Sequence, residues 1–168
     1  MKKIYLLYLL CLFGFLFPIE TLAQSAVGIS GSWQLIPDES APLSYYNTLN
    51  LKIAVNNSHI TFVKKWVAQF PKTDSVDVPT ENIITRIPVT NRIWPYQVFM
   101  GVSMIPGSEK EIKAKWITKD SVLQIDETYP ILISQGREIM HSINTYSLSD
   151  NGQKLTLNIR NNFLNSQS

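Results

Sequence analysis

Residues 111–129, EIKAKWITKDSVLQIDETY, decide the fold class of this chain. Polar and apolar residues alternate within 111–118 and again within 121–129, which is the period-2 pattern of a strand with one buried face. The pair Lys119-Asp120 separates the two runs and has the composition of a turn. This stretch therefore predicts two consecutive antiparallel strands joined by a tight connection.

The same alternation recurs along the chain, and no window of helical length has the apolar spacing of an amphipathic helix. Turn-forming residues separate the alternating runs, as at 56–58 and 149–152. Residues 37–48 and 71–80 lack the pattern, and we expect loops or short helices there. The expected strands are eight, at 31–36, 49–55, 59–69, 83–93, 111–118, 121–129, 137–148 and 154–160.

These strands favour an all-β domain built as an eight-stranded antiparallel up-and-down β-barrel, because closure of the sheet removes its exposed edges. A sandwich of two sheets is the alternative. The chain has 168 residues, of which 45% are hydrophobic and 17% charged. Such a length and composition provide for one ordinary globular domain and exclude a disordered chain.

The first 23 residues have the features of a secretory signal peptide. Lys2 and Lys3 precede an apolar run at 4–17, and a Thr-Leu-Ala sequence ends at Ala23. The run is shorter than the roughly 20 residues of a spanning helix, so we expect no stable membrane insertion after cleavage. We expect residues 24–168 to form the folded domain in the periplasm or outside the cell.

The mature chain is expected to be almost neutral and free of cysteine. Cleavage removes Lys2, Lys3 and Glu20, which lowers the formal net charge from +2 to +1, and it also removes the only cysteine, Cys11. With no basic block longer than Lys64-Lys65, there is little attraction to nucleic acid or to an anionic membrane. The lack of thiols excludes thiol catalysis, iron–sulfur clusters and cysteine-bound zinc.

Two segments of the chain resemble the lipocalin-like (calycin) β-barrels of small secreted bacterial proteins. Gly31-Ser32-Trp33 opens the first expected strand and resembles the Gly-x-Trp sequence of that family, in which the indole plugs the closed end of the barrel. Within 115–157, residues 148–156 match the Leu-Ser-x-x-Gly-x-x-Leu-Thr hairpin of the closing strands. The proline-rich segment 87–106 departs from the family pattern. The resemblance implies a barrel that holds a small apolar or amphipathic ligand, and it implies no particular chemistry.

Aromatic and polar side chains on the inward faces are the candidate ligand contacts. Flat rings line apolar pockets, although they also serve simply to fill a barrel. If Leu123 and Ile125 point inward, Glu127 shares their face, unless its place near a strand end leaves it in water. The candidates are Trp66, Trp94, Tyr96, Phe99, Trp116, Glu127, Ser142, Asn144 and Tyr146.

The chain has no pattern typical of a catalytic or metal site. A Gly-x-Ser-x-Gly elbow and a glycine-rich phosphate loop are both missing from the sequence. We therefore expect no cofactor and no catalysis, and the leading hypothesis is binding of a small hydrophobic or amphipathic molecule. One alternative is a protein-interaction or inhibitor module of the same fold, with 94–105 as its contact surface. The other is a haem binder or an enzyme that uses His141 or Glu127.

Overall fold

The computed structural model describes residues 28–40, 48–67, 71–90 and 102–164. These residues form ten β-strands in two antiparallel sheets and one short 3-10 helix, η2 (Pro37–Glu39). None of the described segments is a helix with the length and apolarity needed to cross a membrane. The all-β prediction is confirmed.

The first sheet contains four strands in chain order. They are β1 (Gly31–Gln34), β2 (Thr48–Asn56), β3 (His59–Val67) and β4 (Pro71–Pro79). The predicted turn between β2 and β3 is present, with Asn57 at a φ of 46°, a left-handed conformation that asparagine tolerates. The prediction of a loop or short helix at 71–80 was wrong, because β4 pairs with β3 along its length.

The second sheet contains the other six strands, and the quoted segment 111–129 forms a hairpin at its centre. Asp120 makes the turn of that hairpin at a φ of 61°. The eight expected strands correspond to β1–β3, β5 and β7–β10, so β4 and β6 are additional. The order is β10 (Leu155–Leu164), β9 (Gly136–Leu148), β8 (Val122–Ile133), β7 (Glu109–Thr118) and β5 (Thr85–Pro88), with β6 (Ser103–Met104) beside β8.

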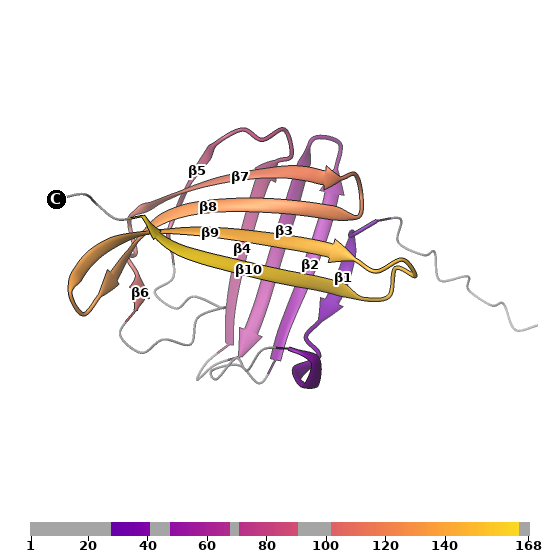
Figure 1. Ribbon diagram of the computed structural model, residues 1–168, viewed down its shortest axis with the longest axis horizontal. Coiled ribbons are helices and arrows are strands. Elements are labelled where there is room, and N and C mark those ends of the chain that lie inside the picture. The colour runs from indigo at the N-terminus through magenta and orange to yellow at the C-terminus, as the bar shows by residue number, and fades with distance from the viewer. Residues whose placement is uncertain (1–27, 41–47, 68–70, 91–101, 165–168) are drawn as a thin grey trace, which may run out of the picture.

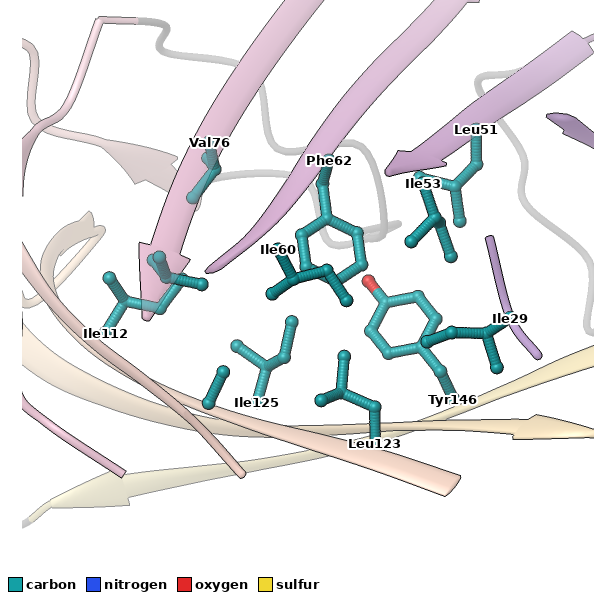
Figure 2. Packing of buried hydrophobic residues seen from close by; sticks show 12 residues of the cluster. Ile29, Leu51, Ile53, Ile60, Phe62, Val76, Ile112, Leu123, Ile125 and Tyr146 are labelled. Carbon is teal, nitrogen blue, oxygen red and sulfur yellow. The ribbon is translucent and has the colours of Figure 1, made fainter. Parts of the chain in front are cut away.

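The two sheets lie face to face with their strands crossing at a steep angle (Figure 1). Alternation along each strand sends one set of side chains between the sheets, where they form a common apolar core. Phe62 from β3 and Tyr146 from β9 meet there, with ring centroids 5.2 Å apart (Figure 2). The remaining buried members are Ile29, Leu51, Ile53, Ile60, Val76, Val78, Ile112, Ala114, Leu123 and Ile125.

Trp33 joins the start of the described chain to this core. Its ring packs against the core cluster, and its Nε1 donates a hydrogen bond to the Ile29 carbonyl oxygen at 3.0 Å. The Ile29 amide in turn donates to the carbonyl oxygen of Asp120, at the turn between β7 and β8, at 2.9 Å. The first sheet is therefore tied to the end of the second through the segment that precedes β1.

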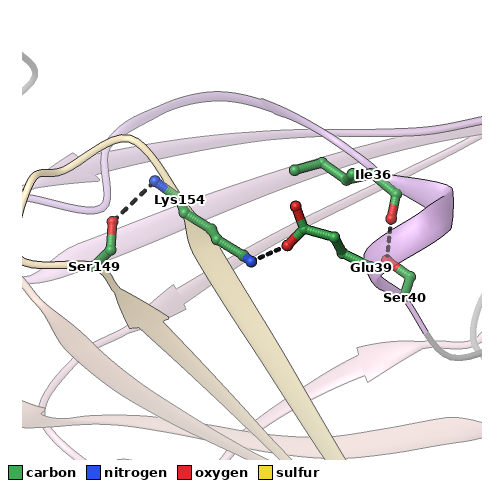
Figure 3. Close-up of polar contacts among 5 residues, drawn as sticks. All are labelled: Ile36, Glu39, Ser40, Ser149 and Lys154. Carbon is green, nitrogen blue, oxygen red and sulfur yellow. Dashed lines mark hydrogen bonds and ion pairs between the residues drawn. The ribbon is translucent and has the colours of Figure 1, made fainter.

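Two further contacts connect the sheets along their sides. The Asn82 amide, just after β4, donates to the Ala114 carbonyl oxygen of β7 at 2.9 Å. On the opposite side, Lys154 forms an ion pair with Glu39 of η2, and its backbone amide donates to Ser149 Oγ (Figure 3). These contacts connect the two layers on both sides of the core.

Candidate functional site

A cavity of about 220 Å³ is lined by residues from both sheets. It lies between the main core and a smaller apolar cluster built on Tyr129, Ile131 and Met140. A volume of this size holds several water molecules. The lining residues are Lys64, Trp66, Asp74, Ser75, Val76, Asp77, Ile87, Pro88, Val89, Thr90, Met104, Lys110, Glu127 and Tyr129.

Glu127 is held by two neighbouring strands at the wall of this cavity. Lys110 Nζ of β7 lies 2.8 Å from Glu127 Oε1, and Asn144 Nδ2 of β9 donates to Glu127 Oε2 at 3.2 Å. Glu127 is 4% exposed and Lys110 is 8% exposed. Removing an ion pair from water costs several kcal/mol per ion, which close geometry and additional hydrogen bonds offset. The cavity wall therefore carries a fixed ion pair with an amide bonded to its acidic member.

Lys64 brings a second ammonium group to the same wall. Its position follows from the alternation of β3, which also sends Ile60, Phe62 and Trp66 inward, while Lys65 points outward. Asp74 is its direct cross-strand partner on β4 and also lines the cavity. The lining thus contains two lysines, Lys64 and Lys110, and three carboxylates, Asp74, Asp77 and Glu127, which come from four strands.

The electrostatic environment keeps the buried groups in their ordinary charge states. Burial raises the pKa of Glu127, but the charges of Lys110 and Lys64 outweigh this effect, so the pKa lies below its usual value of 4.5. Burial lowers the pKa of Lys64, but interactions with Tyr146, Glu127 and Asp74 raise it above 10.5. At neutral pH Glu127 is a carboxylate and Lys64 is an ammonium, so Lys64 is no amine nucleophile.

Trp66 supplies a buried hydrogen-bond donor without an acceptor. The residue is 2% exposed, and its Nε1 has no hydrogen-bond partner within the described part of the chain. Asn144 Oδ1 is likewise without a donor among the described residues. Leaving such an atom unsatisfied costs about 1–3 kcal/mol, so buried polar atoms of this kind usually meet water or a ligand. Trp66 lines the cavity, whereas Asn144 does not and lies behind Glu127, to which its amide donates.

The structure describes six of the nine sequence-predicted residues. Trp66 and Glu127 line the cavity. Ser142 and Asn144, both on β9, are buried next to Glu127 of β8. Tyr146 lies in the apolar core, while Trp116 is half-buried at the edge of that core and does not line the cavity. Trp94, Tyr96 and Phe99 lie outside the described residues.

The alternative that Glu127 is solvated near a strand end was wrong. The sequence pattern ended the strand at Tyr129, whereas β8 continues to Ile133 and Glu127 lies in its middle. Sequence reasoning also missed Lys64, Lys110 and Asp74, because lysine and aspartate were assumed to face water. Extending the inward alternation of Ile60 and Phe62 would have placed Lys64 inside.

His141 occupies the other face of β9. Its neighbours Met140 and Ser142 are buried, whereas His141 is only half-buried and does not line the cavity. Within the described ranges, no group of three or more histidine, cysteine, aspartate or glutamate residues could hold a metal ion.

A larger groove of about 550 Å³ runs along β1, η2 and β10. Its charged lining residues, Glu39 and Lys154, have side chains about half exposed and already pair with each other. The smaller cavity differs because three of its ionic residues, Lys64, Lys110 and Glu127, are buried, and it is therefore the candidate site.

Comparison of the chain with protein-family models, with curated proteins and with solved structures found no match in any of the three. The function of the chain is accordingly argued from the cavity and its lining.

Proposed function

We propose that the chain is a lipocalin-like β-barrel that binds one small amphipathic molecule, without catalysis, in the 220 Å³ cavity. The proposal includes export directed by residues 1–23 to the periplasm or the exterior. The strand order supports the barrel, because most strands lie beside their neighbours in sequence. The chain passes from the first sheet to the second between β4 and β5. The contacts of Asn82 and of Lys154 support closure on the two sides.

The observation that carries the proposal is the mixed character of the cavity wall. Apolar side chains, among them Val76, Ile87 and Met104, form one part of the wall, and the buried groups of Lys64 and Glu127 form another. Small-molecule sites have this composition, in which apolar surface supplies affinity and a few polar groups fix orientation. A solid core would instead have favoured the alternative of a protein-interaction module.

The ionisation of the lining residues supports binding rather than acid–base catalysis. An efficient general acid or base has a pKa near the working pH. In this cavity both pKa values move away from neutral pH, since the pKa of Glu127 is lowered and that of Lys64 is raised. Burial and the charge of Glu127 also raise the pKa of Tyr129, so its hydroxyl stays protonated. Glu127 and Lys64 therefore stay charged and Tyr129 stays neutral at working pH, and such fixed polar groups can orient a ligand.

Fluorescence of an environment-sensitive apolar dye tests this proposal. We expect the exported chain to enhance the dye, and Ile87→Trp, which fills the cavity, to abolish the enhancement. Ile84→Trp is the matched control, because Ile84 is 60% exposed and does not line the cavity. Equal enhancement by both variants would show that the dye binds elsewhere and would contradict the assignment of the site.

A further inference from the structure

β10 is a long strand at the border of the second sheet. The first sheet ends in β1 and β4, and the second ends in β5 and β10 (Figure 1). Within the described residues, β10 pairs with β9 alone, so one side of its backbone has no strand bonded to it. The groove of about 550 Å³ runs along this edge and is lined there by residues 153–159 and 161. The edge is therefore open to a further strand.

The other three edge strands have features that hinder pairing, and β10 has none of them. β1 and β5 are only four residues long. β4 begins at Pro71, ends at Pro79 and carries three charged residues. β10 has ten residues without proline, glycine or a bulge, and Arg160 is its only charged residue. Proteins protect long edges with charges, prolines or bulges, so an unprotected edge indicates a place where another strand pairs.

The bonds between β9 and β10 show which backbone groups face the open edge. The Ser149 amide donates to the Lys154 carbonyl oxygen at 2.9 Å, and this pair continues the register of Leu148 opposite Leu155 by one residue. Pairs that bond directly alternate along an antiparallel ladder with pairs that do not. Even-numbered residues of β10 therefore bond to β9, and odd-numbered residues direct their N–H and C=O groups to the open edge. The odd-numbered residues are Leu155, Leu157, Ile159, Asn161 and Phe163.

A second copy of β10 fits this edge in a preferred register. Two copies related by a two-fold axis pair antiparallel, and odd-numbered residues must lie opposite odd-numbered residues for their backbone groups to bond. Two such registers use nearly the whole strand. One centres on Arg160 and places the two arginines opposite each other. The other centres on Ile159 and places Arg160 opposite Asn158 of the second copy, and it is favoured because like charges directly opposite destabilise a sheet.

We propose that the chain forms a two-fold dimer in which β10 pairs antiparallel with β10 of a second copy, centred on Ile159. In this register Phe163 lies beside Leu155 of the other copy, on the face that points between the sheets. Phe163 is 52% exposed in the single chain, so pairing also removes apolar surface from water. The dimer does not depend on a ligand in the smaller cavity, because no residue of β10 lines that cavity.

Sedimentation velocity of the purified chain over a range of concentrations tests the dimer. Asn158 and Arg160 are exposed on the outer face of β10, so changes at Asn158 leave the core intact. We expect Asn158→Asp to tighten the dimer about threefold or more at low salt, because two aspartate–arginine pairs form, and Asn158→Lys to weaken it by a similar factor. Asn56→Lys is the matched control, since Asn56 lies on β2 outside the groove lining, and it should leave the dimer unchanged.

Asn161→Pro tests the backbone pairing directly. It removes an N–H group that faces the open edge and leaves the bonds to β9 in place, because Asn161 has an odd number in the ladder. We expect this variant to be a monomer at concentrations where the original chain is a dimer. A thermal melt establishes that the variant is folded. If it does not fold, the opposite effects of Asn158→Asp and Asn158→Lys still decide the result.

Amide hydrogen exchange locates the interface. The amides of Leu157, Ile159 and Asn161 should become protected as the concentration rises, whereas those of Thr156 and Asn158 should be protected throughout by their bonds to β9. A chain that stays monomeric up to about 1 mM overturns the proposal and leaves the edge to a strand of another protein. A dimer whose odd-numbered amides exchange as fast as in the monomer, or whose affinity is equal in Asn158→Asp and Asn158→Lys, also overturns it.

Discussion

Glu127 Oε1 and Lys110 Nζ lie 2.8 Å apart on adjacent strands, and both residues are almost completely buried. Their register explains the contact, because Glu127 lies opposite Ile112 and Lys110 precedes Ile112 by two positions on the same face. The pair therefore follows from the β7–β8 hairpin itself. The pair holds one positive and one negative charge at the wall of the cavity, where burial reduces their screening by water.

We expect Glu127→Gln to destabilise the fold by about 3–5 kcal/mol, because it leaves the buried ammonium group of Lys110 without the carboxylate that pairs with it. Urea denaturation at neutral pH measures the change. Glu111→Gln is the control, since Glu111 pairs with Arg86 at the surface, where the side chains of Arg86 and Glu111 are 67% and 42% exposed. That variant should lose no more than about 1 kcal/mol. Equal losses in the two variants would contradict the expectation that the buried ion pair contributes more to the free energy of unfolding than the surface pair.

Stability should fall in acid through the protonation of Glu127. Its pKa is lowered in the folded chain from an ordinary value of 4.5, so the unfolded chain binds more protons as the pH drops below that value. The stabilisation is present above about pH 4.5 and is lost as the pH falls through the folded pKa. We expect the free energy of unfolding to decline more steeply below that pH in the original chain than in Glu127→Gln. If the free energy of unfolding fell equally steeply with pH in both chains, the claim that Glu127 is ionised in the folded state would be wrong.

Phe62 should be sensitive to truncation, because its ring is buried in the apolar core. Phe62→Ala removes a buried ring that packs against Tyr146, and we expect a loss of about 3–5 kcal/mol in the free energy of unfolding. Phe163→Ala on β10 is the matched control, because Phe163 is 52% exposed. Its loss should be a fraction of a kcal/mol up to about 1 kcal/mol. A small effect at Phe62 would indicate that the sheets do not pack as described.

Gly28 should not tolerate alanine. A Cβ at this position would lie 2.7 Å from the Asp120 carbonyl oxygen, and the φ of Gly28 is +84°. Gly152 has a similar φ of +69° with nothing near its Cβ position, so Gly152→Ala measures the cost of the backbone conformation alone. We expect Gly28→Ala to lower the thermal midpoint clearly more than Gly152→Ala. Equal shifts would show that the approach to Asp120 is not tight.

The sequence pattern predicted the inward faces of the central strands well. Alternation placed Glu127 on the face of Leu123 and Ile125, and it placed Ser142 and Asn144 on the inner face of the next strand, where all are buried. The reason is physical, since a pleated strand has only two faces and the apolar residues identify the buried one.

The same reasoning failed where the inward residues are polar. In β4 only Val76 and Val78 are buried, so the strand lacks the apolar run that would have identified it. Lys64 and Lys110 were missed because a lysine is rarely buried without a partner, and its partners here come from other strands. Such contacts depend on the register between strands, which a single sequence does not specify.

Native mass spectrometry of the chain, purified without denaturation, tests the central claim, that the cavity holds a small ligand. The account predicts one bound molecule per chain, released on denaturation, and its loss in Ile87→Trp but not in Ile84→Trp. A chain that arrives without any bound molecule, and that fails to enhance an apolar dye, would contradict it.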